Sequence, residues 1–289
     1  MPTRVNLAVP SKSWLSKKAT LKEPTVLQSF AFDEHNKHLY VLQITATGHE
    51  AGDLCLNRLD YQGNRLGYMY LKGFGHGVSM GVQNDADGTA WIWTECDARG
   101  GYGRGVTRFR FADRATRTNA DVEILKPIAG STSNQPSVCM TSKRIAVRHR
   151  MKGLPRYRVW DLDVFLAKKY DDPLADFAQT GLHPDPDIAF QGYALHGDHV
   201  YQLAGTAYDD VTNPPAKHGN AYLSCLDIHS GKLLQRMRTQ AGYSLTYREP
   251  EGLGLRGGAD PKLYIGLASG QLGSRRFSIY VKDDSEPSS

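Results

Sequence analysis

The sequence has no long apolar run, no closely spaced cysteine pair and little helical periodicity, and each absence excludes a class of protein. No segment approaches the roughly 18 consecutive apolar residues of a membrane-spanning helix, so no membrane partner is predicted. The four cysteines lack Cys-x-x-Cys spacing, which indicates neither a zinc site nor a disulfide framework. We expect them to be reduced residues of the core: Cys55, Cys96, Cys139 and Cys225.

Signals for catalysis, metal binding and export are also scarce. No Gly-x-Ser-x-Gly motif is present, and Ser79 has no evident partner acid, so a nucleophile triad is not predicted. No convergent set of metal ligands is indicated, and we predict neither a metal nor a cofactor. The N-terminal residues MPTRVNLAVPSKSW lack the apolar region of a signal peptide, which predicts a cytoplasmic protein. If a signal was removed, a secreted protein or a phage-particle component is expected instead.

The charge balance is mildly basic. Thirty-five Lys and Arg residues against 30 Asp and Glu give a formal net charge of +5, which favours anionic partners weakly. Several arginines alternate with apolar positions, so we expect them on solvent faces of outer strands and predict no nucleic-acid partner. They are Arg108, Arg110, Arg148, Arg150, Arg156 and Arg158. Nothing in the sequence indicates an oligomeric state.

One hairpin design is repeated five times along the chain. In Gly75–Glu95, a polar and a small residue lead into an alternating strand, an Asn/Asp/Gly turn, and a second strand. The residues that open the five units are 48, 59, 56 and 60 residues apart, a near-constant period typical of propeller blades. These opening residues are Gln28, His76, Gln135, Gln191 and Glu251.

The repeats predict an all-β, five-bladed β-propeller with about four strands per blade, in a single domain over residues 1–289. The fifth unit looks short, so Arg4–Val9, with alternating apolar residues, is expected to supply its outer strand and close the ring. Helical spacing is confined to Leu162–Phe177. The blades are expected at residues 26–72, 75–129, 134–181, 189–240 and 249–282, the last completed by residues 4–9.

Superposed hairpins would bring the five opening residues into a ring around the central channel. Each is followed by a small or kinked residue, which lets five strands crowd near one axis. Because each second strand returns to the face where the first begins, the loops that follow should surround this ring. Three further candidate ligand contacts come from these strand ends and loops: Glu95, Arg150 and Tyr208.

The ring predicts a binding site for a polyhydroxylated or anionic ligand, such as a glycopolymer, because glutamine amides both donate and accept hydrogen bonds. Two alternatives remain open. His76 and Glu251 could act as acid and base in a cytoplasmic enzyme of specialised metabolism that converts a small molecule. The ring could also simply hydrate the channel of a structural phage-tail or assembly component.

Several phrases resemble one propeller family. They are LQSFAFD with LYVLQ, GHGVSMGV with WIWTE, and EPEGLGL with KLYIGLASG. From about Val26 to Val281, the chain resembles the five-bladed family of phage receptor-binding proteins and proteins labelled teichoic-acid-biosynthesis protein C, with helveticin-type bacteriocins nearby. The resemblance implies the propeller fold and, from the phage members, an association with host cell-wall polymers.

Overall fold

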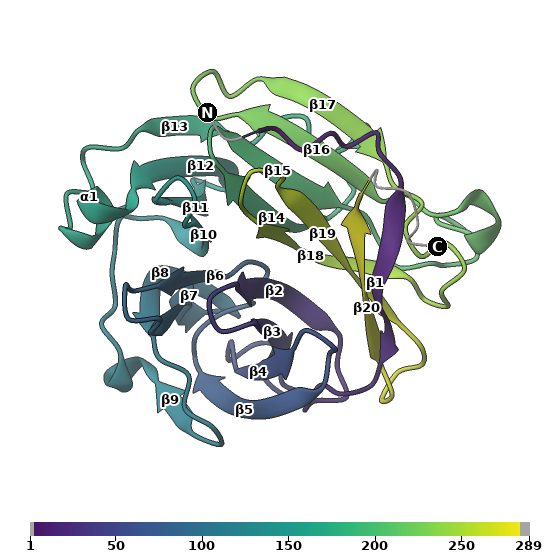
Figure 1. Ribbon diagram of the computed structural model, residues 1–289, viewed down its shortest axis with the longest axis horizontal. Helices are drawn as coiled ribbons and strands as arrows, with labels where there is room; N and C mark the ends of the chain where they lie inside the picture. The colour runs from purple at the N-terminus through teal and green to yellow at the C-terminus, as the bar shows by residue number, and fades with distance from the viewer. Residues whose placement is uncertain (1–2, 284–289) are drawn as a thin grey trace.

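The computed structural model describes residues 3–283, and their strands form five sheets arranged in a ring (Figure 1). The innermost strands contact one another in sequence around the ring, and the strand of the fifth blade returns to that of the first. The five-bladed propeller predicted from the hairpin repeats is therefore confirmed. The inner strands are β2 (Leu27–Asp33), β6 (Gly81–Asn84), β10 (Thr132–Cys139), β14 (Phe190–His196) and β18 (Glu249–Arg256).

The first, third and fourth blades each carry four consecutive antiparallel strands, as the alternating patterns predict. Outside the inner strand, the first blade has β3 (His38–Ile44), β4 (Leu54–Asp60) and β5 (Arg65–Lys72). The third has β11 (Arg144–Met151), β12 (Leu154–Asp161) and β13 (Ala175–Ala178), and the fourth has β15 (His199–Ala204), β16 (Tyr222–Asp227) and β17 (Leu233–Arg238).

The second blade departs from the four-strand pattern. Its sheet contains β6, β7 (Ala90–Arg99) and β8 (Tyr102–Phe109), and the expected outer strand is reduced to one bridge between Val106 and Leu125. The preceding strand β9 (Thr116–Thr118) instead pairs in parallel with β5 of the first blade. A short 3-10 helix, η1 (Asn119–Asp121), capped by the Thr118 side chain, follows β9 and precedes the bridge of Leu125 to β8.

A strand near the N-terminus closes the ring, but it is not the one predicted. The strand β1 (Ser11–Lys18) pairs with β20 (Arg276–Lys282), outside β19 (Lys262–Ser269) of the fifth blade (Figure 1). Residues 4–9 form no strand among the described residues. Their alternation has another cause: Val5 and Leu7 insert into the core between the fourth and fifth blades, and their amides donate to Tyr201 Oη and Gln235 Oε1.

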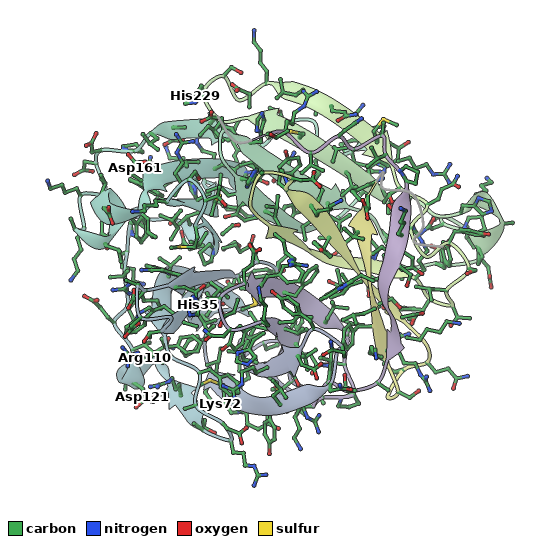
Figure 2. The ribbon with its side chains drawn as sticks, viewed as in Figure 1. His35, Lys72, Arg110, Asp121, Asp161 and His229 are labelled. Carbon is green, nitrogen blue, oxygen red and sulfur yellow. The ribbon has the colours of Figure 1, made fainter. Side chains whose placement is uncertain are left out.

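Helical structure is confined to short segments in the described residues. The predicted helical spacing yields α1 (Leu162–Leu166), after which the chain extends into β13. A second 3-10 helix, η2 (Pro215–Lys217), lies in the loop between β15 and β16. No helix within residues 3–283 is long and apolar enough to span a bilayer. Apolar side chains fill the spaces between blades, whereas polar groups such as Asp121, Asp161 and His229 lie on the outer rim (Figure 2).

The inner strands approach closely enough that glycine is required between some of them. A Cβ atom at Gly252 would lie 2.8 Å from the Cα of Ser29, and one at Gly192 would lie 2.9 Å from the Cα of Gly252. Both glycines also have positive φ angles, of +79° and +133°. Because the atoms they face belong to the backbone, neighbouring side chains cannot relieve the contact by changing rotamer.

Replacing Gly252 with alanine should destabilise the protein by about 3 kcal/mol, the sum of backbone strain and a clash with the adjacent inner strand. The Gly130→Ala variant is a matched control, since Gly130 has φ +73° but no described atom within 4 Å of a Cβ. We expect it to lose only about 1 kcal/mol, from strain alone. Urea unfolding measures both values. Equal losses in the two variants would refute crowding at the channel axis.

Candidate functional site

The five residues that open the hairpin units line one pocket of ≈ 900 Å³ at a mouth of the central channel. This cavity, called the ring pocket below, also includes residues of the loops that follow the second strands of the blades. The ring geometry expected from the spacing is thus present. That these side chains bind a ligand stays a prediction. The five residues are Gln28, His76, Gln135, Gln191 and Glu251.

Carboxyl groups of the fifth blade form one side of the ring pocket. Glu251 is buried, and its Oε1 accepts a hydrogen bond from Gln28 Nε2 at 3.3 Å. Burial, together with the neighbouring Glu249 carboxylate, raises the pKa of Glu251 well above its ordinary value. Tyr247 Oη donates to Glu249 Oε2 at 2.7 Å. This side of the pocket therefore favours a protonated Glu251 carboxyl, which can donate a hydrogen bond to a ligand oxygen.

Arginines form another side, and Arg148 is its most constrained member. Its Nη1 donates to Gln135 Oε1 at 2.9 Å, its Nε and Nη2 donate to Gln179 Oε1, and its guanidinium lies 3.7 Å from the ring centroid of Phe190. Burial lowers the pKa of Arg148. Arg99 and Arg150 also line the pocket. The fixed guanidinium geometry suits carboxylate or phosphate oxygens.

Arg148 corrects the expectation that this arginine series covers solvent faces of outer strands. It lies on β11, the second strand of its blade, and only 4% of it is exposed. Alternation along β11 separates two faces but does not reveal what covers each one. Near the channel mouth, Phe190 of the next blade covers this face, and the guanidinium reaches the pocket beside it.

His76 sits between two aromatic neighbours that the sequence interpretation did not select. Its ring stacks on Tyr102, with centroids 5.3 Å apart and planes inclined by 5°, and meets His49 edge-on. Burial and the nearby His49 lower the pKa of His76 to about 4, so the imidazole is neutral at pH 7. Its Nδ1 atom has no hydrogen-bond partner among residues 3–283. This atom is itself buried, so it is not exposed to the ring pocket in this structure.

Glu95, a predicted ligand contact, lies behind the pocket wall. It is fully buried, and its two carboxylate oxygens accept hydrogen bonds from the amides of Gly77 and Gly103, each at 2.7 Å. These amides adjoin His76 and Tyr102, so Glu95 fixes the two segments that carry the stacked rings. Burial outweighs the amide hydrogen bonds and raises the pKa of Glu95 to about 7. Its structural role is to position other residues.

The other two candidates differ in position. Arg150 lines the ring pocket, as expected for a loop-proximal residue. Tyr208 does not join it: this side chain borders a separate pocket of ≈ 350 Å³ with Asp209 and Tyr243, and its hydroxyl donates to the Tyr243 carbonyl. The long loop between β15 and β16 carries Tyr208 away from the channel.

Other pocket residues were missed by sequence reasoning. Tyr102 lies in a glycine-rich segment whose flexibility is visible in the sequence, and Phe190 immediately precedes the ring residue Gln191. Adjacency to a ring residue is the signal that could have identified Phe190. Within residues 3–283, no group of three or more His, Cys, Asp or Glu side chains is arranged to hold a metal ion.

Comparison with known proteins agrees with this architecture. Residues 26–281 match the family described as the phage five-bladed beta propeller receptor binding platform domain. The chain belongs to this family. It is also 27% identical over 277 residues to the Bacillus subtilis (strain 168) protein named major teichoic acid biosynthesis protein C, covering 90% of this chain. The chain spans 60% of that relative's length. The resemblance inferred from the sequence is confirmed.

Solved structures show the same propeller fold. The tail fiber of Staphylococcus aureus phage P68 superposes with a TM-score of 0.75 at 17% identity, over 94% of this chain and 52% of that one. An exo-beta-1,3-galactanase from Clostridium thermocellum superposes with a TM-score of 0.50 at 11% identity, over 95% and 63% of the respective chains. At these identities the likeness concerns the fold alone, because one fold can carry unrelated sites.

The raised pKa of Glu95 has a consequence for stability. Because its folded-state pKa, about 7, exceeds the unfolded value, the folded state binds this proton more tightly, and stability falls as pH rises from about 4.5 to 7. The full difference is on the order of 3 kcal/mol. We expect Glu95→Gln to remove this part of the slope in urea unfolding measured across that range.

The Glu50→Gln variant is the control for this measurement, because the Glu50 side chain is 93% exposed and its removal should leave the slope unchanged. Glu251, whose pKa is also raised, keeps its own contribution to the slope in both proteins. A slope in Glu95→Gln as steep as in wild type would contradict the role of Glu95.

Proposed function

We propose that the ring pocket binds a segment of a polyhydroxylated, anionic polymer, such as a glycopolymer of a cell wall. The convergence of five polar side chains from five blades in one open pocket is the observation that carries this proposal. Their positions follow from the propeller rather than from any single loop. The pocket volume of ≈ 900 Å³ is at the upper end of ligand sites and suits more than one sugar or polyol unit.

The distribution of charge supports an extended ligand with two kinds of group. Arg99, Arg148 and Arg150 provide guanidinium groups suited to phosphate or carboxylate oxygens. In the same pocket, the Glu251 carboxyl and the glutamine amides suit hydroxyl groups, which donate and accept hydrogen bonds. The stacked rings of His76 and Tyr102 present aromatic surface beside these polar groups. A phosphodiester-linked polyol or sugar contains both kinds of oxygen.

The relatives are consistent with this class of ligand. The description of the family names receptor binding, and the name of one relative refers to teichoic acid biosynthesis. One structural neighbour is a phage tail fiber. A receptor polymer would be met outside the cell, so the proposal goes with a phage particle or a secreted protein rather than with the cytoplasm.

Isothermal titration with purified wall teichoic acid should detect binding, and Arg150→Gln should weaken it about tenfold through loss of a charge-assisted contact. Arg150 suits this test because its hydrogen bond is local, to the Gly153 carbonyl, so its removal should not disturb the fold. The matched control is Arg156→Gln, on the same blade but paired with Asp176 outside the pocket. A neutral dextran tests the need for negative charge.

Two results would contradict the proposal. Equal weakening by Arg150→Gln and Arg156→Gln would indicate a general attraction to positive charge rather than a pocket. Failure of the folded wild-type protein to bind the anionic polymer would exclude this class of ligand for the ring pocket.

A second candidate is catalysis in the same pocket, favoured by the protonation states of two ring residues. Burial raises the pKa of Glu251, so its carboxyl is in the form that a general acid needs. The lowered pKa of His76 keeps its imidazole in the form that a general base needs. If the pocket is catalytic, bound polymer should change mass with time, and Glu251→Gln should slow this at least ~100-fold. Unchanged mass would leave binding as the function.

A further inference from the structure

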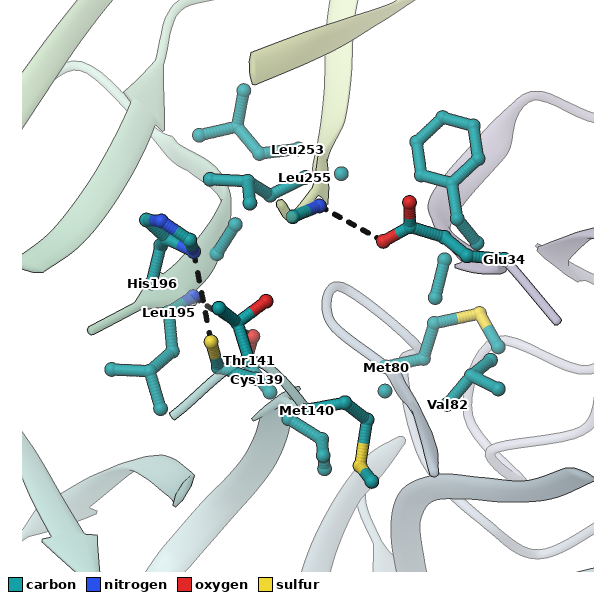
Figure 3. Close-up of a pocket in the computed structure, with 18 of the residues that line it drawn as sticks. Glu34, Met80, Val82, Cys139, Met140, Thr141, Leu195, His196, Leu253 and Leu255 are labelled. Carbon is teal, nitrogen blue, oxygen red and sulfur yellow. Dashed lines mark hydrogen bonds between the residues drawn. The ribbon is translucent and has the colours of Figure 1, made fainter. Parts of the chain in front are cut away.

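A small cavity lies at the opposite mouth of the channel, where the inner strands end. It has a volume of ≈ 90 Å³ and is distinct from the ring pocket. Cys139 ends β10 of the third blade and His196 ends β14 of the fourth, and both line this narrow cavity. Figure 3 shows the two side chains facing each other across the blade boundary, with the thiol sulfur 3.6 Å from His196 Nδ1.

The surroundings of His196 determine which atom of this pair donates. The imidazole is fully buried, and its Nε2 atom has no hydrogen-bond partner among the described residues. A proton on Nε2 would therefore be buried without an acceptor, which is more costly than a free lone pair. This geometry favours the tautomer with the proton on Nδ1, whose N–H donates to the Cys139 sulfur. This arrangement stabilises a thiolate.

Backbone groups assist His196. Burial alone would raise the pKa of Cys139, but hydrogen bonds from His196 and from the amides of Ser142 and Gly197 outweigh it and lower the pKa to about 7. The nearby charged side chains form two ion pairs, Glu34 with Arg256 and Arg144 with Asp198. The titratable group in direct contact with the sulfur is thus the imidazole.

The remaining cysteines provide an internal comparison. Each is completely buried, and burial raises its pKa to about 12. In the described part of the chain, no histidine contacts their sulfur atoms within hydrogen-bond distance. All four cysteines are free, and Cys96 and Cys225 lie in core clusters other than that of Cys139. The three remaining cysteines are Cys55, Cys96 and Cys225.

We propose that Cys139 is a modification site that takes small peroxides through the narrow cavity, with His196 as its positioning residue. The thiolate sulfur attacks one oxygen of hydrogen peroxide, an S–O bond forms and the O–O bond breaks. The sulfur is oxidised to a sulfenic acid, the peroxide is reduced, and the departing hydroxide takes up a proton to become water. A cavity of ≈ 90 Å³ admits this one added oxygen and excludes bulky oxidants.

The first test compares the four cysteines within the folded, full-length protein. A limiting amount of hydrogen peroxide is added to the folded protein at pH 7, the protein is then unfolded in the presence of a sulfenic-acid trap, and the labelled peptides are quantified by mass spectrometry. We expect Cys139 to be labelled at least ~100-fold faster than Cys55, Cys96 and Cys225, because only the thiolate reacts. Labelling of all four at one rate, or faster labelling of another cysteine, would overturn the proposal.

The second test separates positioning from simple exposure. His196→Leu removes the Nδ1 donor, whereas His196→Asn keeps an N–H near the same place. The leucine variant should slow labelling of Cys139 more than ~10-fold, and the asparagine variant should stay within ~3-fold of wild type. His199→Leu, in the same hairpin but without contact to Cys139, serves as the control. Unchanged labelling in His196→Leu would overturn the role of His196.

The pH dependence supplies a readout that does not rely on a variant folding. In wild type, the rate of Cys139 oxidation by hydrogen peroxide should rise with a midpoint near pH 7, as a stabilised thiolate requires. A midpoint near that of an ordinary thiol, about 8.5, would contradict the proposed hydrogen bond to the sulfur.

Discussion

The closeness of five inner strands at one axis is the constraint on which the rest of the structure depends. Hydrogen bonds between neighbouring inner segments fix it: Ser29 Oγ donates to the Gly77 carbonyl and Ser79 Oγ donates to the Pro136 carbonyl. The Leu195 amide donates to Ser137 Oγ at the next boundary. A serine can do this only where backbones approach within one side chain's length. The blades are therefore registered to one another at their inner edges.

This packing of the inner strands determines the geometry of both channel mouths. The starts of the inner strands bring glutamine, histidine and glutamate side chains into the ring pocket, and the ends bring Cys139 against His196. Between the mouths, the channel is narrowed by the contacts at Gly192 and Gly252. The two sites are thus built on the same strands but have separate chemistry. Only three residues of one strand separate Gln135 in the ring pocket from Cys139 in the narrow cavity.

The sequence predicts the blades and the ring because both depend on local patterns that repeat. Alternating strands joined by a short turn define each hairpin, and equivalent positions in equivalent hairpins must meet at the axis. Features that depend on what packs against a strand cannot be predicted from these local patterns. The alternation at Val5 and Leu7 predicts a strand, but these two side chains are buried in the core without forming one. The alternation at Arg148 predicts an exposed side chain, but Phe190 of the next blade covers it. The Cys139–His196 contact joins residues 57 positions apart.

The pairing of β1 with β20 governs the order in which the molecule can be assembled. These strands come from opposite ends of the described chain, so their ladder forms only after every blade between them has been made. Closing so long a loop costs conformational entropy, so the hydrogen bonds between β1 and β20 form late in folding. During synthesis β1 is made long before its partner β20. Its edge therefore stays unpaired until β20 is made, and an unpaired edge is prone to wrong pairing. Three lysines and three serines among the eight residues of β1 keep this unpaired edge soluble.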